Sequence, residues 1–153
     1  MSKYADLRID YKKAMLEETT VKSDPLAQFD QWFNEAVAAE IPEPNAFTLA
    51  TVGENGTPSA RVLLLKGVDH GGFVFYTNYT SDKAKDIKQF PVGSMVFLWL
   101  GLERQVRISG PISKVSREES EAYFHSRPRE SQIGAWVSPQ SKIIESRDVL
   151  EQN

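Results

Sequence analysis

The stretch YFHSRPRESQIGAW, residues 123–136, concentrates side chains that could bind a phosphate group. Tyr123 and Arg127 are four residues apart and so share a helix face, which Ser131 joins if helical winding continues past Pro128. A guanidinium offers paired donors that match phosphate oxygens. The simpler alternative is a solvated helix end with Tyr123 packed against the rest of the protein. The stretch alone leaves both interpretations open.

A second candidate is RVLLLK, residues 61–66, where Arg61 and Lys66 bracket an apolar run. The default interpretation is a core strand with a charge at each end. The functional alternative is a strand edge that binds a planar ligand, with the two cations reaching its phosphates. Residues five apart point to opposite faces of an ideal strand. Both cations therefore serve one site only if the strand end bends or the site lies between subunits.

Two further stretches carry polar groups next to predicted elements. In FYTNYTSDKAKDI, Ser81 and Lys83 stand at a predicted helix N-terminus, where free amides and the helix dipole favour an anion. A capped surface helix is the alternative. In LERQVRI, Gln105 lies within a predicted strand and faces either solvent or the polar edge of a ligand.

Composition excludes several classes of function. The chain has 153 residues, a formal net charge of -3 and a pI near 5.5, which argues against bulk binding to nucleic acid or an anionic membrane. It has no cysteine, which excludes disulfides and thiolate chemistry, and two histidines are too few for an ordinary histidine-based metal site. No signal peptide or membrane-spanning run is recognisable, so we expect a cytoplasmic protein without a metal.

The elements that must position these groups follow from hydrophobic periodicity. A helix is predicted from Asp24-Pro25, with one apolar face, and residues 5–19 are predicted to form a loosely attached helical arm. The expected apolar face consists of Leu26, Phe29, Phe33, Ala36 and Val37. Strands are predicted at AFTLATVG, RVLLLKGV, FVFYTN, SMVFLWLG and RQVRISGPISKV, the first two joined by a hairpin at Asn55-Gly56.

Shorter helices complete the predicted fold. Ser81 is expected to cap a helix over 81–90, and Ser116 with Glu119 has the spacing of a capping box that opens a helix to about Ser126. A last helix is predicted from Ser141. The whole pattern is mainly β with flanking helices, which favours a small antiparallel barrel.

The order of these motifs along the chain resembles that of the pyridoxine/pyridoxamine 5′-phosphate oxidases. The resemblance rests on RVLLLK, FYTN followed by S-x-K, LERQVRI and YFHSRPRESQIGAWVSPQS, and it extends back to ADLRIDY at residues 5–11. It implies a homodimer of split β-barrels of the FMN-binding type, with FMN at the subunit interface. It also implies that residues 1–153 form one domain, of which residues 1–23 are an N-terminal arm.

The same resemblance implies a role for particular residues, although it identifies no catalytic residue. The expected FMN contacts are Arg61, Val62, Leu63, Leu64, Leu65, Lys66, Tyr76, Thr77, Lys83, Gln105, Gln140 and Ser141. The expected substrate contacts are Arg8, Tyr11, Lys66, Tyr123, Arg127 and Ser131. Arg8 and Tyr11 would close over the substrate from the N-terminal arm.

The implied reaction is FMN-dependent oxidation of pyridoxamine and pyridoxine 5′-phosphates to pyridoxal 5′-phosphate. A hydride would pass to flavin N5, and O2 would reoxidise the flavin and give H2O2. The alternatives are a split-barrel protein that binds FMN or pyridoxal phosphate without turnover, and a flavin reductase acting on another substrate.

Two departures from the family pattern stand out. Asp82 occupies the position of an arginine associated with the FMN phosphate, and an acid there repels the anion unless it points away. The family also continues into a final strand pair, with a tryptophan and an R-x-H-x-R motif, that has no counterpart after Ser141. We therefore expect either a shortened homologue or an incomplete chain.

Overall fold

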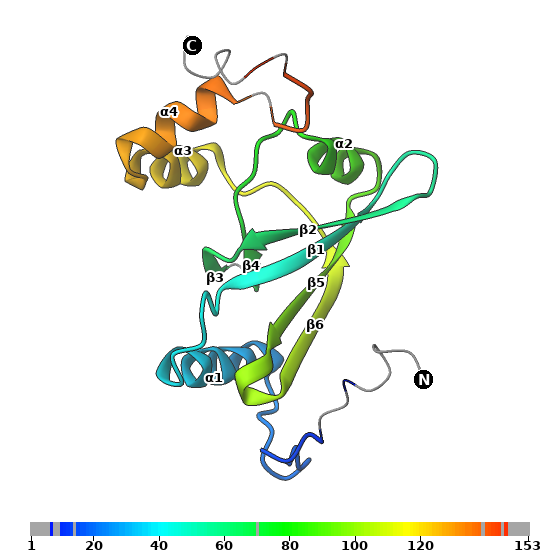
Figure 1. The fold of residues 1–153 in the computed structure, drawn as a ribbon, viewed down its shortest axis with the longest axis vertical. Coiled ribbons are helices and arrows are strands. Elements are labelled where there is room, and N and C mark those ends of the chain that lie inside the picture. Colours follow the sequence, from blue (N-terminus) through cyan, green and yellow to red (C-terminus); the bar gives the residue numbers. More distant parts are fainter. Residues whose placement is uncertain are drawn as a thin grey trace.

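A four-stranded antiparallel sheet is the framework of the protein (Figure 1). The computed structural model describes residues 7, 10–13, 15–69, 71–138, 140–144 and 146. The sheet has the order β2-β1-β5-β6, and β3 and β4 form a separate pair. The strands are β1 (Ala46–Val52), β2 (Pro58–Leu64), β3 (Gly67–Asp69), β4 (Gly72–Val74), β5 (Val92–Trp99) and β6 (Arg104–Pro111). The helices are α1 (Pro25–Ala38), α2 (Asp82–Gln89), the short 3-10 turn η1 (Leu100–Leu102), α3 (Arg117–Ser126) and α4 (Arg129–Val137).

Helix α1 begins where the sequence predicts. The Asp24 carboxylate accepts a hydrogen bond from the Leu26 amide at 3.0 Å, which satisfies one of the free amides of the first turn. Phe29 and Ala36 are buried, but Val37 is 51% exposed, so the predicted apolar face was wrong at that position. At 3.6 residues per turn, Val37 lies roughly 80° around the helix from Phe29 and misses the core.

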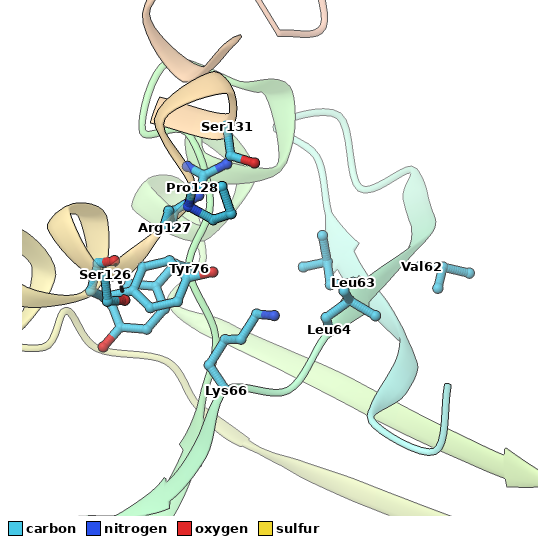
Figure 2. A pocket seen from close by; sticks show the side chains of 10 residues that line it. Val62, Leu63, Leu64, Lys66, Tyr76, Ser126, Arg127, Pro128 and Ser131 are labelled. Carbon is cyan, nitrogen blue, oxygen red and sulfur yellow. Dashed lines mark hydrogen bonds between the residues drawn. The ribbon is translucent and has the colours of Figure 1, made fainter. Parts of the chain in front are cut away.

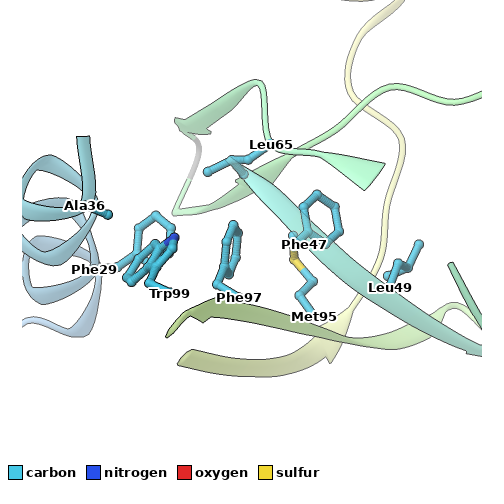
Figure 3. Close-up of a cluster of buried hydrophobic side chains, with 8 residues drawn as sticks. All are labelled: Phe29, Ala36, Phe47, Leu49, Leu65, Met95, Phe97 and Trp99. Carbon is cyan, nitrogen blue, oxygen red and sulfur yellow. The ribbon is translucent and has the colours of Figure 1, made fainter. Parts of the chain in front are cut away.

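The core lies between one face of the sheet and helix α1 (Figure 3). Alternate residues of β1 and β5 point into it, as the two-residue period of a strand requires. Phe29 packs edge-on against Phe73 with ring centroids 4.8 Å apart, and lies 5.0 Å from Phe97. Trp99, which is 1% exposed, donates from Nε1 to the Pro44 carbonyl oxygen at 2.9 Å. This core fixes α1 to the sheet.

The predicted strand RVLLLKGV is interrupted in the structure. Strand β2 ends at Leu64, and the amide of Lys66 donates to the Val74 carbonyl oxygen at 2.8 Å. The chain therefore leaves β1 and pairs with β4, which itself ends at Val74, so FVFYTN is a strand only in part. An apolar run indicates burial but not which neighbour it pairs with, and this explains the wrong boundaries.

Pro128 divides the stretch YFHSRPRESQIGAW, residues 123–136, between two helices. The Ser116 hydroxyl accepts from the Glu119 amide at 3.0 Å, which confirms the predicted cap of α3. Helix α3 ends at Ser126, and Arg127 has extended backbone angles (φ -75°, ψ 150°), as expected for a residue before proline. Helix α4 then starts at Arg129, so helical winding does not run unbroken from Tyr123 to Ser131.

The structure corrects three other local predictions. The described part of residues 5–19 contains no helix, nor do residues 141–144 and 146; the rest of these two predicted helices lies outside the described residues. The Ser81 hydroxyl does not cap α2 and instead donates to the Asn78 carbonyl oxygen at 2.7 Å. In the part of the chain that the structure covers, no helix is long and apolar enough to cross a membrane.

Candidate functional site

A groove of about 560 Å³ opens between the end of β2, the chain after β4, and the junction of α3 with α4 (Figure 2). We call it the Lys66 groove. Its lining residues are Val62, Leu63, Leu64, Lys66, Tyr76, Tyr123, Ser126, Arg127, Pro128 and Ser131. The groove brings together Lys66, Tyr123, Arg127 and Ser131, the four residues expected to hold the substrate phosphate, although they come from three separate segments. Their assignment as substrate ligands stays a prediction.

Backbone geometry explains how these side chains reach one space. Because β2 ends at Leu64, Lys66 follows a bend and extends toward the space bordered by Arg127 and Ser131 (Figure 2). The bend brings Lys66 to the groove but not Arg61, so the two cations that bracket RVLLLK do not line one site in a single copy of the chain. The extended backbone at Arg127 and the restart of the helix at Arg129 bring Arg127 and Ser131 to one wall. The break at Pro128 therefore shapes the groove.

Two stacked tyrosines form another wall. The rings of Tyr76 and Tyr123 are nearly parallel, at 4°, with centroids 3.8 Å apart. The Tyr76 hydroxyl donates to Glu119 Oε1 at 3.2 Å. Burial raises the pKa of Tyr76, and the negative charge of Glu119 raises it further, so the phenol stays protonated at neutral pH. The stack holds Tyr123 against the body of the protein while it faces the groove.

A second cationic region lies at the start of α2. Lys83 is 7% exposed, and its ammonium donates to Gln140 Oε1 at 2.9 Å and to Ser81 Oγ at 3.3 Å. Burial lowers the pKa of Lys83, and the positive charge of Arg61 lowers it further. Within the described residues Lys83 forms no salt bridge. A buried ammonium near a guanidinium is the donor set that an anion such as the FMN phosphate requires.

Arg61 is positioned by the core face of the sheet. Its guanidinium donates to Thr51 Oγ1 at 2.7 Å and to Ser59 Oγ at 2.6 Å, and lies 3.8 Å from Asp86 Oδ2. Thr51 in turn donates to Asp86 at 2.7 Å. This network fixes the orientation of Arg61. Sequence reasoning missed Thr51 and Asp86: the signal for Thr51 is the strand pairing that places it opposite Ser59, and Asp86 on α2 is brought to it only by tertiary packing.

Asp82 turns away from this cationic region. Its carboxylate accepts from Lys85 Nζ at 2.8 Å on the exposed side of α2. The hydrogen bond from Lys85 and its charge lower the pKa of Asp82. Pairing with Lys85 offsets part of the negative charge of Asp82, although that charge still acts on Lys83 and raises its pKa.

The remaining predicted flavin contacts are spread over several environments. Val62 is exposed, Leu65 is a core residue, Thr77 is half-buried, and Ser141 is exposed with a left-handed backbone at φ 64°. Leu65 is 7% exposed, and its amide and carbonyl groups are both hydrogen-bonded to Asn45, which leaves it little surface for a ligand. These contacts stay predictions.

Two predicted residues lie outside the Lys66 groove. Gln105 is on β6, at the opposite edge of the sheet from β2, and lines a separate cavity of about 340 Å³ with Trp32 of α1 and residues of the N-terminal arm. Tyr11 is 73% exposed on that arm. Arg8 lies outside the described residues. A single copy of the chain therefore does not gather all of the predicted site.

The same motifs and fold recur in known proteins. The family model described as pyridoxamine 5′-phosphate oxidase matches residues 33–153. The pyridoxine/pyridoxamine 5′-phosphate oxidase of Burkholderia ambifaria is 59% identical over 151 residues, which cover 99% of this chain and 71% of that protein. The enzyme of the same name from Salinibacter ruber is 56% identical, over 100% of this chain and 71% of that protein.

Solved structures of related proteins have a similar fold. PhzG from Burkholderia lata, in complex with tetrahydrophenazine-1-carboxylic acid, superposes with a TM-score of 0.85 at 26% identity, over 90% of this chain and 69% of that one. A pyridoxamine 5′-phosphate oxidase-related, FMN-binding protein from Nostoc punctiforme superposes with a TM-score of 0.66 at 20% identity, over 86% and 73%. The fold is thus that of the FMN-binding split β-barrels. The chain belongs to the pyridoxamine 5′-phosphate oxidase family.

Proposed function

We propose that this protein uses FMN to oxidise pyridoxamine 5′-phosphate and pyridoxine 5′-phosphate to pyridoxal 5′-phosphate. The observation that carries the proposal is the convergence of Lys66, Tyr123, Arg127 and Ser131 on one groove. Two cations and two hydroxyls around an open space match the charge and the acceptor oxygens of a phosphate monoester. The names of relatives at 56–59% identity point to the same substrates.

The residues of the groove would bind and orient the substrate. Arg127 would donate paired hydrogen bonds to the phosphate, and Lys66 would add a charge from the opposite side. The protonated Tyr76 and its stacked partner Tyr123 would supply a flat apolar wall. Holding the two reactants in reacting geometry can lower a barrier by about 7–11 kcal/mol, which suits a site that is built mainly from binding groups.

The cations at the start of α2 would hold the cofactor. Bound FMN supplies the redox chemistry, since it accepts a hydride from the substrate and passes the electrons to O2, giving H2O2. Lys83 and Arg61 would bind its phosphate, because they form a buried cationic region with ordered polar neighbours. Gln140 would keep the Lys83 ammonium in place.

A homodimer would complete the site. The strand register places Val62, Leu98 and Gln105 on the sheet face opposite the core, where Val62 is 66% and Leu98 is 55% exposed. A second copy that covered this apolar face could bring its Gln105 to the Lys66 groove. Sedimentation of the FMN-loaded protein tests this part of the proposal. A monomer at micromolar concentration would contradict it.

The test of the reaction is anaerobic reduction of the flavin. The purified chain is reconstituted with FMN, pyridoxamine 5′-phosphate is added without oxygen, and the absorption band of oxidised flavin is followed. Bleaching, followed by recovery with H2O2 formation when air is admitted, is the expected result. A flavin that binds but stays oxidised would overturn the proposal in favour of a binding protein without turnover.

A further inference from the structure

The N-terminal arm is fastened to the β5–β6 turn by one carboxylate. Glu103 Oε2 accepts hydrogen bonds from two successive amides of the arm, Lys12 N at 2.7 Å and Lys13 N at 2.8 Å. The Lys13 ammonium donates to the Gly101 carbonyl oxygen at 2.8 Å. Hydrogen bonds to an ionised acceptor are about twice as strong as neutral ones. These three bonds join segments about 90 residues apart in sequence.

The fastening continues along the arm. The amide of Lys22 donates to Gln28 Oε1 at 2.7 Å, and Gln28 is 8% exposed on α1. Between these two points, Met15 and Leu16 line the cavity that Gln105 also lines. Figure 1 shows the blue segment that directly precedes α1 at the same end of the molecule as α1 and the β5–β6 turn. The described residues of the arm therefore contact this end of the molecule at more than one point.

The backbone at Glu103 supports a specific role for its side chain. Glu103 has a left-handed conformation, with φ 51°, which is strained for residues other than glycine. Glu40 has a similar φ of 52°, so this backbone conformation alone does not require the contact; what distinguishes Glu103 is that its carboxylate binds two amides of the arm. Glu103 also stands two residues before Gln105, so one short segment carries both the fastening and a predicted flavin contact.

We propose that Glu103 is a positioning residue that ties the N-terminal arm to the corner carrying Gln105 and so sets where Tyr11 stands relative to the substrate. This inference rests on the proposed function. Tyr11 directly precedes the first bound amide, and its ring is 73% exposed and free to meet a ligand. The arm and Gln105 would then enter the assembled site as one unit.

The test compares two glutamates in the same backbone conformation. Glu103→Gly removes the carboxylate and suits a left-handed residue, so the turn itself is not strained by the change. Glu40→Gly makes the same change at φ 52°, where the exposed side chain makes no hydrogen bond or ion pair with any residue that the structure describes, and it serves as the control. Thermal unfolding of both variants checks that each folds.

The first readout needs no activity, because trypsin cuts after Lys12 and Lys13, the residues held by Glu103. Mass spectrometry of the FMN-loaded protein should show roughly tenfold faster cleavage there in Glu103→Gly, in line with losing two charge-assisted hydrogen bonds. Glu40→Gly should match the wild type. Glu103→Gln keeps an acceptor oxygen and should restore most of the protection. Equal cleavage of Glu103→Gly and Glu40→Gly overturns the fastening.

The second readout separates positioning from a purely structural role. In Glu103→Gly, KM for pyridoxamine 5′-phosphate should rise several-fold while the Kd for FMN stays within about twofold, and Glu103→Gln should recover most of the affinity. Faster cleavage with an unchanged KM overturns the positioning role. If the wild type neither bleaches FMN nor binds pyridoxal 5′-phosphate, the proposed function and the positioning role both fail, whereas the cleavage comparison still decides whether Glu103 holds the arm.

Discussion

The two cationic regions of the candidate site differ in how far water reaches them. Lys83 is 7% exposed and its pKa is lowered by burial, whereas Lys66 is exposed at the mouth of an open groove. A desolvated cation gains most from an anion that stays bound, because each release would leave the charge buried again. An exposed cation is solvated by water, so it costs little free energy when no anion is bound to it. The difference suits a resident cofactor in the first region and an exchanging substrate in the second.

The largest expected effect is on substrate binding and comes from truncating Arg127 in the Lys66 groove. Arg127→Ala should raise KM for pyridoxamine 5′-phosphate roughly 10- to 100-fold, because hydrogen bonds to charged groups contribute about 1.5–3 kcal/mol and 1.4 kcal/mol corresponds to tenfold. The Kd for FMN should change little. Steady-state kinetics and flavin fluorescence measure the two quantities.

The matched control for this variant is Arg129→Ala, two residues further along on the exposed start of α4 and outside the groove. It should leave KM near the wild-type value. If both arginine variants raise KM for pyridoxamine 5′-phosphate equally, general electrostatic attraction would explain the result. The groove would then lose its proposed role in binding the substrate phosphate.

Replacing the buried Lys83 should weaken the binding of FMN, whereas Arg127→Ala should weaken the binding of the substrate. Lys83→Met keeps the length of the side chain and removes the charge, so FMN binding should weaken roughly tenfold or more. The protein without FMN should unfold at the same or a slightly higher temperature, because a desolvated charge has been removed. Fluorescence titration and thermal unfolding provide both values.

Lys85→Met is the control on the same helix, since Lys85 is exposed and paired with Asp82. Its effect on FMN affinity should be small. A loss of FMN affinity in Lys85→Met as large as in Lys83→Met would remove the distinction between the buried and the exposed cation.

Sequence patterns predicted the features of the fold that depend on residues close together in the chain. The cap at Ser116, the start of α1 at Asp24 and the alternation of β1 follow from short-range chemistry, and the structure confirms them. The convergence of the residues proposed to bind the phosphate could not be worked out from spacing. It depends on the bend after Leu64 and the break at Pro128, which are set by strand pairing and by the chain's path around the core.

Contacts between distant segments left weaker traces in the sequence. The hydrogen bonds from the Lys12 and Lys13 amides to Glu103 join residues about 90 positions apart in the sequence. Hydrophobic periodicity cannot predict such a contact. Trp136 is a case of the opposite kind, because a large aromatic residue, a type usually buried, is 82% exposed on α4. Tertiary packing decides both cases, and a single sequence records little of it.

The pH dependence of FMN binding should sharpen the contrast further. Because the folded pKa of Lys83 is below its ordinary value of 10.5, the unfolded chain binds more protons in the interval between the two values. The stability of the FMN-free protein should therefore rise with pH across that interval. FMN binding needs the protonated ammonium, so affinity should fall as pH rises through the lowered pKa, by up to about tenfold per pH unit.

Fluorescence titrations of FMN at a series of alkaline pH values measure this slope. Lys83→Met has no titratable group at position 83, so the part of the slope that is due to Lys83 should disappear in this variant. An identical slope in the wild type and the variant would show that another group is responsible.

The smallest expected effect belongs to Asp82, which stands next to Lys83 in sequence but turns away from it. Asp82→Asn removes a carboxylate whose partner is the exposed Lys85, and an exposed pair contributes about 0–1 kcal/mol. The Kd for FMN should therefore change by about threefold or less. A much tighter complex in Asp82→Asn would show that the carboxylate acts on the phosphate through space. In that case the region around Lys83 would be less shielded from the surface than its burial indicates, and the contrast with the open Lys66 groove would weaken.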